Sequence, residues 1–154
     1  SLKKKKENFH SRYSATKRKY KYIIINRIAP LSLDSNRAWH IKTKLNIDLM
    51  KRGAKLLLGT KDFSTFRSSS CNAKTPIKTL QEVDIKKKNN SIEIVFTSKS
   101  FLQQQVRSMV GCLKYLGEKK WDLKTFNKVF KSKERVLCAP PAPPEGLFLV
   151  RVIY

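Results

Sequence analysis

Residues 9–26 read FHSRYSATKRKYKYIIIN, a segment that begins basic and aromatic and ends apolar. From about position 17 it is basic, aromatic and β-branched without Gly or Pro, which is typical of a β-strand. A cationic strand with interleaved tyrosines fits a nucleic-acid ligand, because the charges bind phosphates and the rings offer stacking surfaces. An ordinary edge strand protected by lysines fits this segment equally well. Because side chains alternate on a pleat, one face carries Arg18, Tyr20, Tyr22 and Ile24, and the other carries Lys17, Lys19, Lys21 and Ile23.

The charge of the whole chain favours the nucleic-acid interpretation. The 154 residues include 34 Lys and Arg against 11 Asp and Glu, which gives a net charge of +23. A field of this sign attracts polyanions, whose counterions are released on binding. A lysine-rich genome would raise the Lys content, but it does not explain so few acidic residues. RNA or DNA is therefore the expected partner, and an anionic membrane surface is a distant second.

Length and residue usage exclude several other classes of protein. The chain is long enough for one domain with a sizeable core. Its cysteines, Cys71, Cys112 and Cys138, are odd in number and lack a CxxC spacing, which indicates reduced thiols in an intracellular protein. Only His10 and His40 are present, too few for a metal cluster. No apolar run approaches the roughly 18 residues of a membrane span. We therefore expect no metal, no cofactor and no membrane segment.

The first half of the chain predicts one helix after the opening strand. A short strand or packed connector is expected at 38–41. Asn46 is a good N-cap for a helix over 47–58, where apolar residues recur at helical spacing and Gly59 provides a stop. Residues 61–74 are polar and irregular.

The second half predicts a hairpin and two further helices. Residues 79–96 alternate apolar and polar around a turn at 89–90. Residues 101–116 carry an apolar helical stripe that Gly117 ends. Asp122 is the N-cap of the last helix.

These elements define the expected architecture. A proline-rich loop at 138–144 leads into an apolar strand at 147–154, whose density of large residues predicts a buried central position in the sheet. Strands and helices do not alternate strictly. We therefore expect an α+β domain over 9–154, preceded by a basic arm at 1–8, with an antiparallel or mixed sheet and about three helices packed on one face.

Arg107 is difficult to place by periodicity. It lies in the most apolar helix, beside the core stripe. Composition alone favours an arginine exposed to solvent. The alternative is a partly buried guanidinium that binds a carboxylate or a phosphate, for which its fixed fork of donors is suited.

Four segments together resemble the C-terminal half of the tRNA pseudouridine synthase A (TruA) family. They are FHSRYSATKRKYKYIIIN, LLLGTKDFSTFRSSSC followed by Pro76, FLQQQVRSMVG, and PPEGLFLVRVIY, and they occur in the family's order over nearly all of the chain. The resemblance implies isomerisation of uridine to pseudouridine in tRNA, without a metal or organic cofactor. The target nucleotide would be flipped into a cleft, where an aspartate attacks it.

The resemblance also implies roles for three residues of this chain. Tyr20 matches the family's tyrosine that stacks on the flipped base and helps to remove the final proton. Arg107 matches the arginine that pairs with the catalytic aspartate and keeps it ionised. Leu147 matches the aliphatic residue that lines the uracil pocket.

The family's nucleophilic aspartate has no counterpart in this sequence. It belongs to an RTD-G-VH type motif of the N-terminal domain, and acids such as Asp34, Asp62 and Asp84 match other family positions or none. Gln103 and Gln104 stand where bacterial members often carry His, which resembles the eukaryotic branch more. We expect this chain alone to bind RNA without catalysis. An excised domain, a truncated gene and a separate polypeptide that supplies the aspartate all remain open explanations.

The expected partner is tRNA, together with a second copy of the chain or a separate N-terminal half, in the cytoplasm or a mitochondrion. A stand-alone RNA-binding module without catalysis is the alternative function, and a membrane-surface protein is third. Phe63 and Phe66 are expected to pack in the core, and Asp62 to serve a turn or a cap. The candidate phosphate contacts are His10, Arg12, Lys17, Arg18 and Lys19, followed by Lys61 and Arg67.

Overall fold

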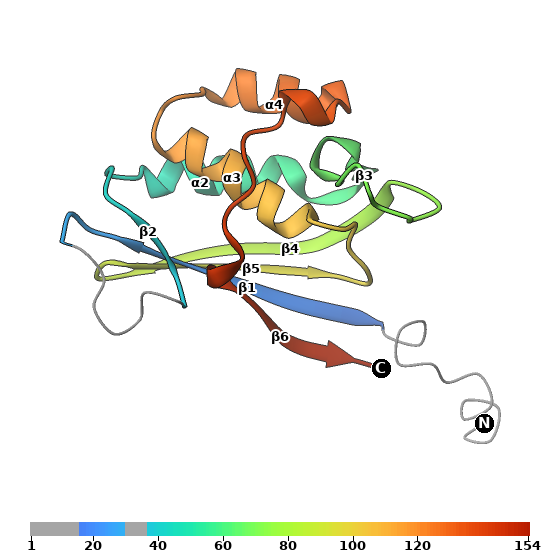
Figure 1. Ribbon diagram of the computed structural model, residues 1–154, viewed down its shortest axis with the longest axis horizontal. Helices are drawn as coiled ribbons and strands as arrows, with labels where there is room; N and C mark the ends of the chain where they lie inside the picture. The colour runs from blue at the N-terminus through green and yellow to red at the C-terminus, as the bar shows by residue number, and fades with distance from the viewer. Residues whose placement is uncertain (1–15, 30–36) are drawn as a thin grey trace.

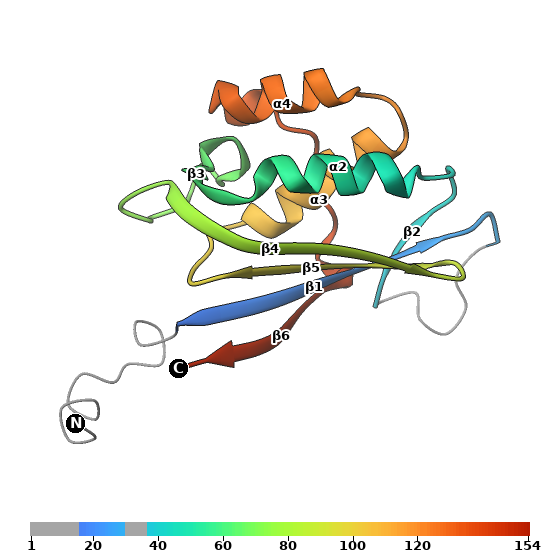
Figure 2. The same ribbon diagram turned by 180° about the vertical axis from the view of Figure 1, so that it is seen from behind.

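The computed structural model describes residues 16–29 and 37–154 of the chain. Within these ranges, six strands form one mixed sheet and three α-helices cover one of its faces (Figure 1). The view from behind shows the same layering, and no described helix covers the opposite face of the sheet, here called the open face (Figure 2). The predicted α+β class is therefore confirmed. The predicted arm at 1–8 lies outside the described residues.

Strand β1 is the centre of the sheet. One edge of β1 pairs antiparallel with β5, and the sheet continues through β4 to β3. The other edge is shared, because β6 pairs antiparallel with residues 17–22 and β2 pairs parallel with residues 24–26. The strands are β1 (Lys17–Asn26), β2 (Trp39–Ile41), β3 (Gly59–Asp62), β4 (Ile77–Lys88), β5 (Ser91–Ser98) and β6 (Leu147–Ile153).

The helices begin at the predicted caps. In α2 (Ile47–Leu57), the Asn46 side chain accepts a hydrogen bond from the Leu49 amide at 3.0 Å. In α4 (Leu123–Ser132), Asp122 accepts one from the Thr125 amide at 2.7 Å. Helices α2 and α3 (Gln105–Gly117) pack together above the sheet, and α4 lies on their outer side (Figure 1).

The core lies between the helices and the sheet. Tyr22 and Ile24 are fully buried, so their face of β1 is the one that packs against the helices. Fully buried apolar neighbours on β5 and α3 include Ile92, Ile94, Phe96, Met109, Val110, Leu113 and Leu116.

Helix α3 begins four residues later than predicted. Gln104 has a left-handed backbone with φ 64°. The buried Gln105 side chain accepts a hydrogen bond from the Leu102 amide at 2.8 Å, and the Gln103 carbonyl accepts one from the Ser68 amide at 3.0 Å. Because these groups bond outside a helical ladder, residues 101–104 form a turn that the apolar stripe does not reveal.

The prediction of a buried central position for the last strand is wrong. Strand β6 pairs only with β1, so it lies at the edge of the sheet. Leu149 and Val150 are 54% and 51% exposed. The high apolar content of this strand therefore does not correspond to burial on both faces. The prediction of an irregular segment at 61–74 also misses β3 and a short 3₁₀ helix (Ser64–Phe66).

Candidate active site

Tyr20 lies on the helix-covered face of β1, two residues before the buried Tyr22. Its ring is half-buried and meets Phe101 edge to face, with the ring centroids 5.3 Å apart. Its hydroxyl makes no hydrogen bond to any residue in the described ranges. Because no buried side-chain oxygen or nitrogen there lacks a partner, this hydroxyl is accessible to solvent. The phenol is therefore held by its ring and open at its polar end.

Tyr22 is used differently. Its hydroxyl donates a hydrogen bond to the Pro143 carbonyl at 2.5 Å. Burial raises the pKa of Tyr22, the charge of Glu145 raises it further, and the positive charge of Arg107 acts in the opposite direction. Tyr22 is therefore a neutral donor that holds residues 138–146, here called the proline strap, against β1.

The proline strap also contacts Arg107 on α3. The Arg107 Nε donates to the Ala142 carbonyl at 2.7 Å, and the Ala142 amide donates to the Arg107 carbonyl at 2.9 Å. The side chain is half-buried, which agrees with the second of the two interpretations made from sequence. Within the described ranges, neither terminal guanidinium nitrogen is hydrogen-bonded and no carboxylate forms an ion pair with Arg107. The guanidinium is thus anchored at one nitrogen and available at two.

Leu147 follows the proline strap and begins β6 opposite Tyr22. It is half-buried against the core. Gly146, just before it, lies so close to β1 that an added Cβ would be 2.7 Å from the Tyr22 ring and 2.8 Å from the Ile23 carbonyl oxygen. One connected segment therefore links Arg107, Tyr22 and Leu147. All three lie on the same side of the sheet as Tyr20.

The predicted RNA contacts on β1 lie on both faces of the strand, because successive side chains alternate between its two faces. Arg18 shares the face of Tyr20 and donates to the Lys99 carbonyl at 2.5 Å. Lys17 is exposed, and Lys19 forms an ion pair with Glu82 at 3.6 Å on the open face. Lys17 and Lys19 therefore point away from Tyr20. His10 and Arg12 lie outside the described residues.

The two weaker candidates for phosphate contacts are already engaged. Lys61 Nζ donates to the Leu56 carbonyl at 2.6 Å. Arg67 Nη2 donates to the Ala73 carbonyl at 2.7 Å. The predicted packing roles of Phe63 and Phe66 are confirmed, since they are 0% and 1% exposed.

Asp62 serves a turn, as predicted. Its Oδ1 accepts a hydrogen bond from the Ser64 amide at 2.8 Å. Burial would raise its pKa, but the hydrogen bonds from Ser64 and the charges of Lys133 and Arg67 hold that pKa below its usual range.

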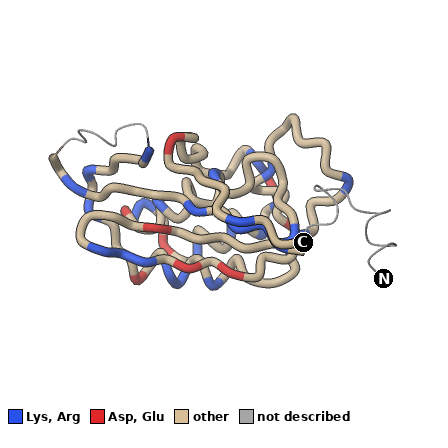
Figure 3. The backbone as a smooth tube through the Cα atoms, turned by 90° about the horizontal axis from the view of Figure 1, so that it is seen from below, with Lys and Arg blue, Asp and Glu red and all other residues tan. Residues whose placement is uncertain are grey.

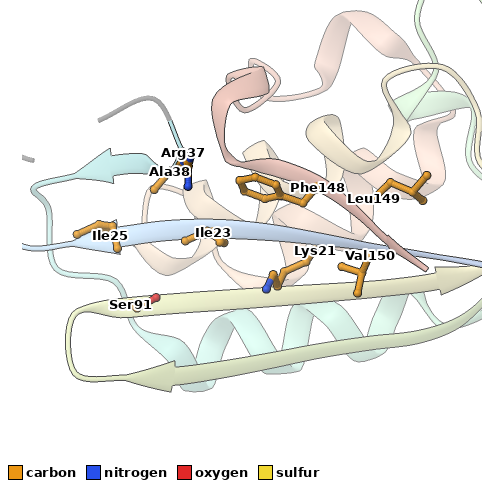
Figure 4. Close-up of a pocket in the computed structure, with 9 residues that line it drawn as sticks. All are labelled: Lys21, Ile23, Ile25, Arg37, Ala38, Ser91, Phe148, Leu149 and Val150. Atoms are coloured by element: carbon orange, nitrogen blue, oxygen red, sulfur yellow. The ribbon is translucent and has the colours of Figure 1, made fainter. Parts of the chain in front are cut away.

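Two hollows lie away from these residues. The first, of about 570 Å³, is on the open face of the sheet between β2 and β6, where Ile23, Ile25, Phe148 and Val150 give it an apolar wall (Figure 4). It contains none of the predicted site residues.

The second hollow, of about 560 Å³, is lined by Lys44, Lys87 and Lys119. These lysines form no ion pair within the described part of the chain. Glu118 also lines this hollow, but it pairs with Lys114 at 3.3 Å. Figure 3, which shows the open side of the sheet, marks the basic β4–β5 hairpin at the end far from the labelled C-terminus.

The described residues contain no group of three or more His, Cys, Asp or Glu side chains that could hold a metal ion. Across the same residues, no helix combines the length and apolar character needed to cross a membrane.

Comparison with known proteins identifies the family. The sequence model described as tRNA pseudouridine synthase matches residues 54–154, which is more than half of the chain. The chain belongs to the tRNA pseudouridine synthase family. Arg107 and Leu147 lie within the matched region, and Tyr20 precedes it.

Several tRNA pseudouridine synthase A proteins are similar over almost the whole chain. The one from Pelagibacter ubique is 66% identical over 154 residues, and those from Paramagnetospirillum magneticum and Afipia carboxidovorans are 48% and 46% identical over 148 residues. The match covers 100% of this chain but 63% of the Pelagibacter protein, and 96% of this chain but 58% and 60% of the other two. These relatives are bacterial, and they give no support to a mitochondrial location.

Sequence reasoning missed Tyr22, Ala142 and Gly146, which join Arg107 to β1. Gly146 belongs to the segment PPEGLFLVRVIY that resembles the family, but the resemblance assigned a role only to Leu147. No local pattern indicates that the Pro143 carbonyl would meet a tyrosine 121 positions away. Such a contact follows from the tertiary fold alone.

Proposed function

We propose that this chain is the tRNA-binding C-terminal half of a pseudouridine synthase, and that an aspartate from outside residues 1–154 completes its active site. The observation that carries the proposal is Arg107. In a family member, a half-buried guanidinium that is anchored at Nε and has two nitrogens unbonded among the described residues is suited to one carboxylate. Residues 9–154 would act as one domain.

Arg107 would keep the incoming aspartate ionised. A fixed positive charge favours the charged form of a neighbouring carboxylate and lowers its pKa. The ionised carboxylate is the form that attacks the nucleotide. The hydrogen bond from Nε to the Ala142 carbonyl holds the guanidinium, and the bond from the Ala142 amide to the Arg107 carbonyl fixes the backbone beside it, so its orientation would be set before the aspartate arrives.

Tyr20 and Leu147 would receive the flipped uridine. Tyr20 presents a half-buried ring, braced by Phe101, and its hydroxyl, which bonds no described residue, lies where it would help to remove the final proton. Leu147 offers an aliphatic side chain at the start of β6. A ring and an aliphatic wall hold a base by stacking and packing, while phosphates of the flanking nucleotides would bind His10, Arg12 and Arg18.

The partners of the complete enzyme are part of this proposal. We infer tRNA as substrate, either a second copy of the chain or a separate N-terminal half as protein partner, and the bacterial cytoplasm as location. The bacterial relatives named tRNA pseudouridine synthase A support this choice.

The test supplies the part of the Pelagibacter ubique protein that this chain does not cover, as a separate polypeptide. Pseudouridine in tRNA is measured by nucleoside chromatography for the unmodified chain and for Arg107→Ala. We expect Arg107→Ala to lower turnover by about two to three orders of magnitude, as for loss of one preorganised charged donor, with tRNA affinity nearly unchanged. Arg52→Ala is the matched control, because Arg52 is 61% exposed on α2.

The same assay distinguishes the proposed function from the alternative one. A stand-alone RNA-binding module predicts that Arg107→Ala weakens tRNA binding or does nothing, and that no second polypeptide produces turnover. Pseudouridine formed by the chain alone in a single-turnover reaction would contradict the proposed division of the site.

A further inference from the structure

Two of the three cysteines lie together beside the candidate site. Cys112 on α3 is 1% exposed, and Cys138 at the start of the proline strap is half-buried. Their sulfur atoms are 3.5 Å apart, although the residues are 26 positions apart in sequence. Cys71 is also a free thiol, and no contact joins it to the other two.

We propose that Cys112 and Cys138 form a dithiol site that a low-molecular-weight disulfide, such as oxidised glutathione, converts reversibly to an intramolecular disulfide. A disulfide bond is about 2.05 Å long, so the two sulfurs need to approach by roughly 1.5 Å. Cys138 lies in a segment without α-helix or strand, so a small movement of the proline strap supplies this approach while Cys112 stays in α3. The proposal does not depend on the proposed enzymatic function.

The groups around the two cysteines indicate which thiol reacts first. The hydrogen bond from Cys112 lowers the pKa of Cys138; burial acts in the opposite direction, and the charge of Arg135 lowers that pKa further. The hydrogen bond with Cys138 and burial both raise the pKa of Cys112. The more exposed Cys138 is therefore the thiolate that reacts first.

The exchange balances in two steps. The Cys138 thiolate attacks one sulfur of oxidised glutathione, which forms a mixed disulfide and releases one glutathione thiolate. Cys112 then loses its proton to the released thiolate and attacks the Cys138 sulfur, which expels the second glutathione. Two protein thiols are oxidised, and one glutathione disulfide is reduced to two thiols.

The bond would fix the proline strap to α3 next to Arg107. Gly111, beside Cys112, already lies against the strap, because an added Cβ would be 2.1 Å from the Pro140 oxygen. Ala142, four residues after Cys138, holds Arg107 through two hydrogen bonds. Oxidation would therefore restrict the segment that orients Arg107, whereas reduction would release it.

The test incubates the full chain with reduced and oxidised glutathione at increasing oxidised fraction. We expect two of the three thiols to disappear together, the intact mass to fall by two hydrogens, and peptide mapping to join Cys112 to Cys138. Dithiothreitol should restore all three thiols. The Ala142 amide should exchange with solvent more slowly in the oxidised protein.

The matched controls are single substitutions. Cys71→Ser should still lose both remaining thiols together, whereas Cys138→Ser and Cys112→Ala should lose none as an internal disulfide. If either of the last two fails to fold, Cys71→Ser and the unsubstituted chain decide the question. Three free thiols over the whole range, stable glutathione adducts, or a bond that includes Cys71 would each overturn the proposal.

Discussion

Tyr20 and Tyr22 show how two identical residues on one face of one strand take different roles. The Tyr22 hydroxyl is bonded to Pro143, and its side chain is fully buried. The Tyr20 hydroxyl has no partner in the described ranges, and its ring is only half-buried. Removing the Tyr22 hydroxyl therefore tests a structural hydrogen bond, whereas removing the Tyr20 hydroxyl tests a group that is available to a ligand.

Tyr22→Phe should lower the free energy of unfolding by about 1 kcal/mol or somewhat more, because the Pro143 carbonyl loses its donor. Tyr20→Phe should change it by less than about 0.5 kcal/mol, since no hydrogen bond to a described residue is lost. Urea denaturation of both variants measures the difference. Equal midpoints for the two variants would contradict the assignment of Tyr22 as the anchor of the proline strap.

The proline strap is the element that connects the helix layer to the sheet. It meets α3 at Arg107 and Gly111, meets β1 at Tyr22, and ends at Gly146, just before Leu147. Its contacts are close, so the position of Arg107 depends on how tightly the strap packs on β1.

Gly146→Ala tests this packing. The added methyl group would meet both the Tyr22 ring and the Ile23 carbonyl, so the strap must move away from β1. We expect a loss of about 1 to 3 kcal/mol of stability, as for overpacking in a core. Hydrogen exchange at the Ala142 amide should become faster. Gly59→Ala is the contrast, because the nearest atom to its added Cβ is 3.8 Å away and only its φ of 104° is strained. Unchanged Ala142 exchange in Gly146→Ala would show that the strap does not respond as a unit.

Most of the fold followed from sequence where a signal is local. Caps at Asn46 and Asp122 and the alternation on each side of residues 89–90 depend on neighbouring residues, and the structure confirms them. The place of β6 in the sheet depends on which edge of β1 is free, which no local pattern encodes. In the candidate site, Tyr20, Arg107 and Leu147 came from resemblance to a family. The bonds that hold Arg107 join distant backbone carbonyls, so the residue types alone could not predict them.

At the scale of the whole molecule, positive charge extends well beyond the candidate site. Lys44, Lys87 and Lys119, which form no ion pair with any described residue, line the hollow at the hairpin end of the sheet. If about six phosphates of tRNA are contacted, the logarithmic dependence of affinity on salt should have a slope of roughly −4 to −5. Part of this slope should arise from the lysine-lined hollow.

Replacing these three lysines together with Gln should make the salt slope of tRNA binding less steep by about 2 to 3, since each lost phosphate contact removes somewhat under one unit. The matched control replaces Lys124, Lys128 and Lys131 with Gln, because these exposed lysines lie on α4, the layer farthest from the sheet (Figure 1). Fluorescence anisotropy at several salt concentrations measures both slopes. Equal changes in the two variants would show that net charge alone governs binding.

The shared edge of β1 also affects how the chain reaches its native state. The Thr16 amide donates to the Ile153 carbonyl at 2.7 Å, and the two residues are 137 positions apart. During synthesis, residues 17–22 therefore wait for β6, which follows all the other described strands in sequence, before that edge is complete. Closing so long a loop is slow. A nascent chain will expose an unpaired, tyrosine-bearing edge until β6 has been made, and chaperone capture should be greatest in that interval.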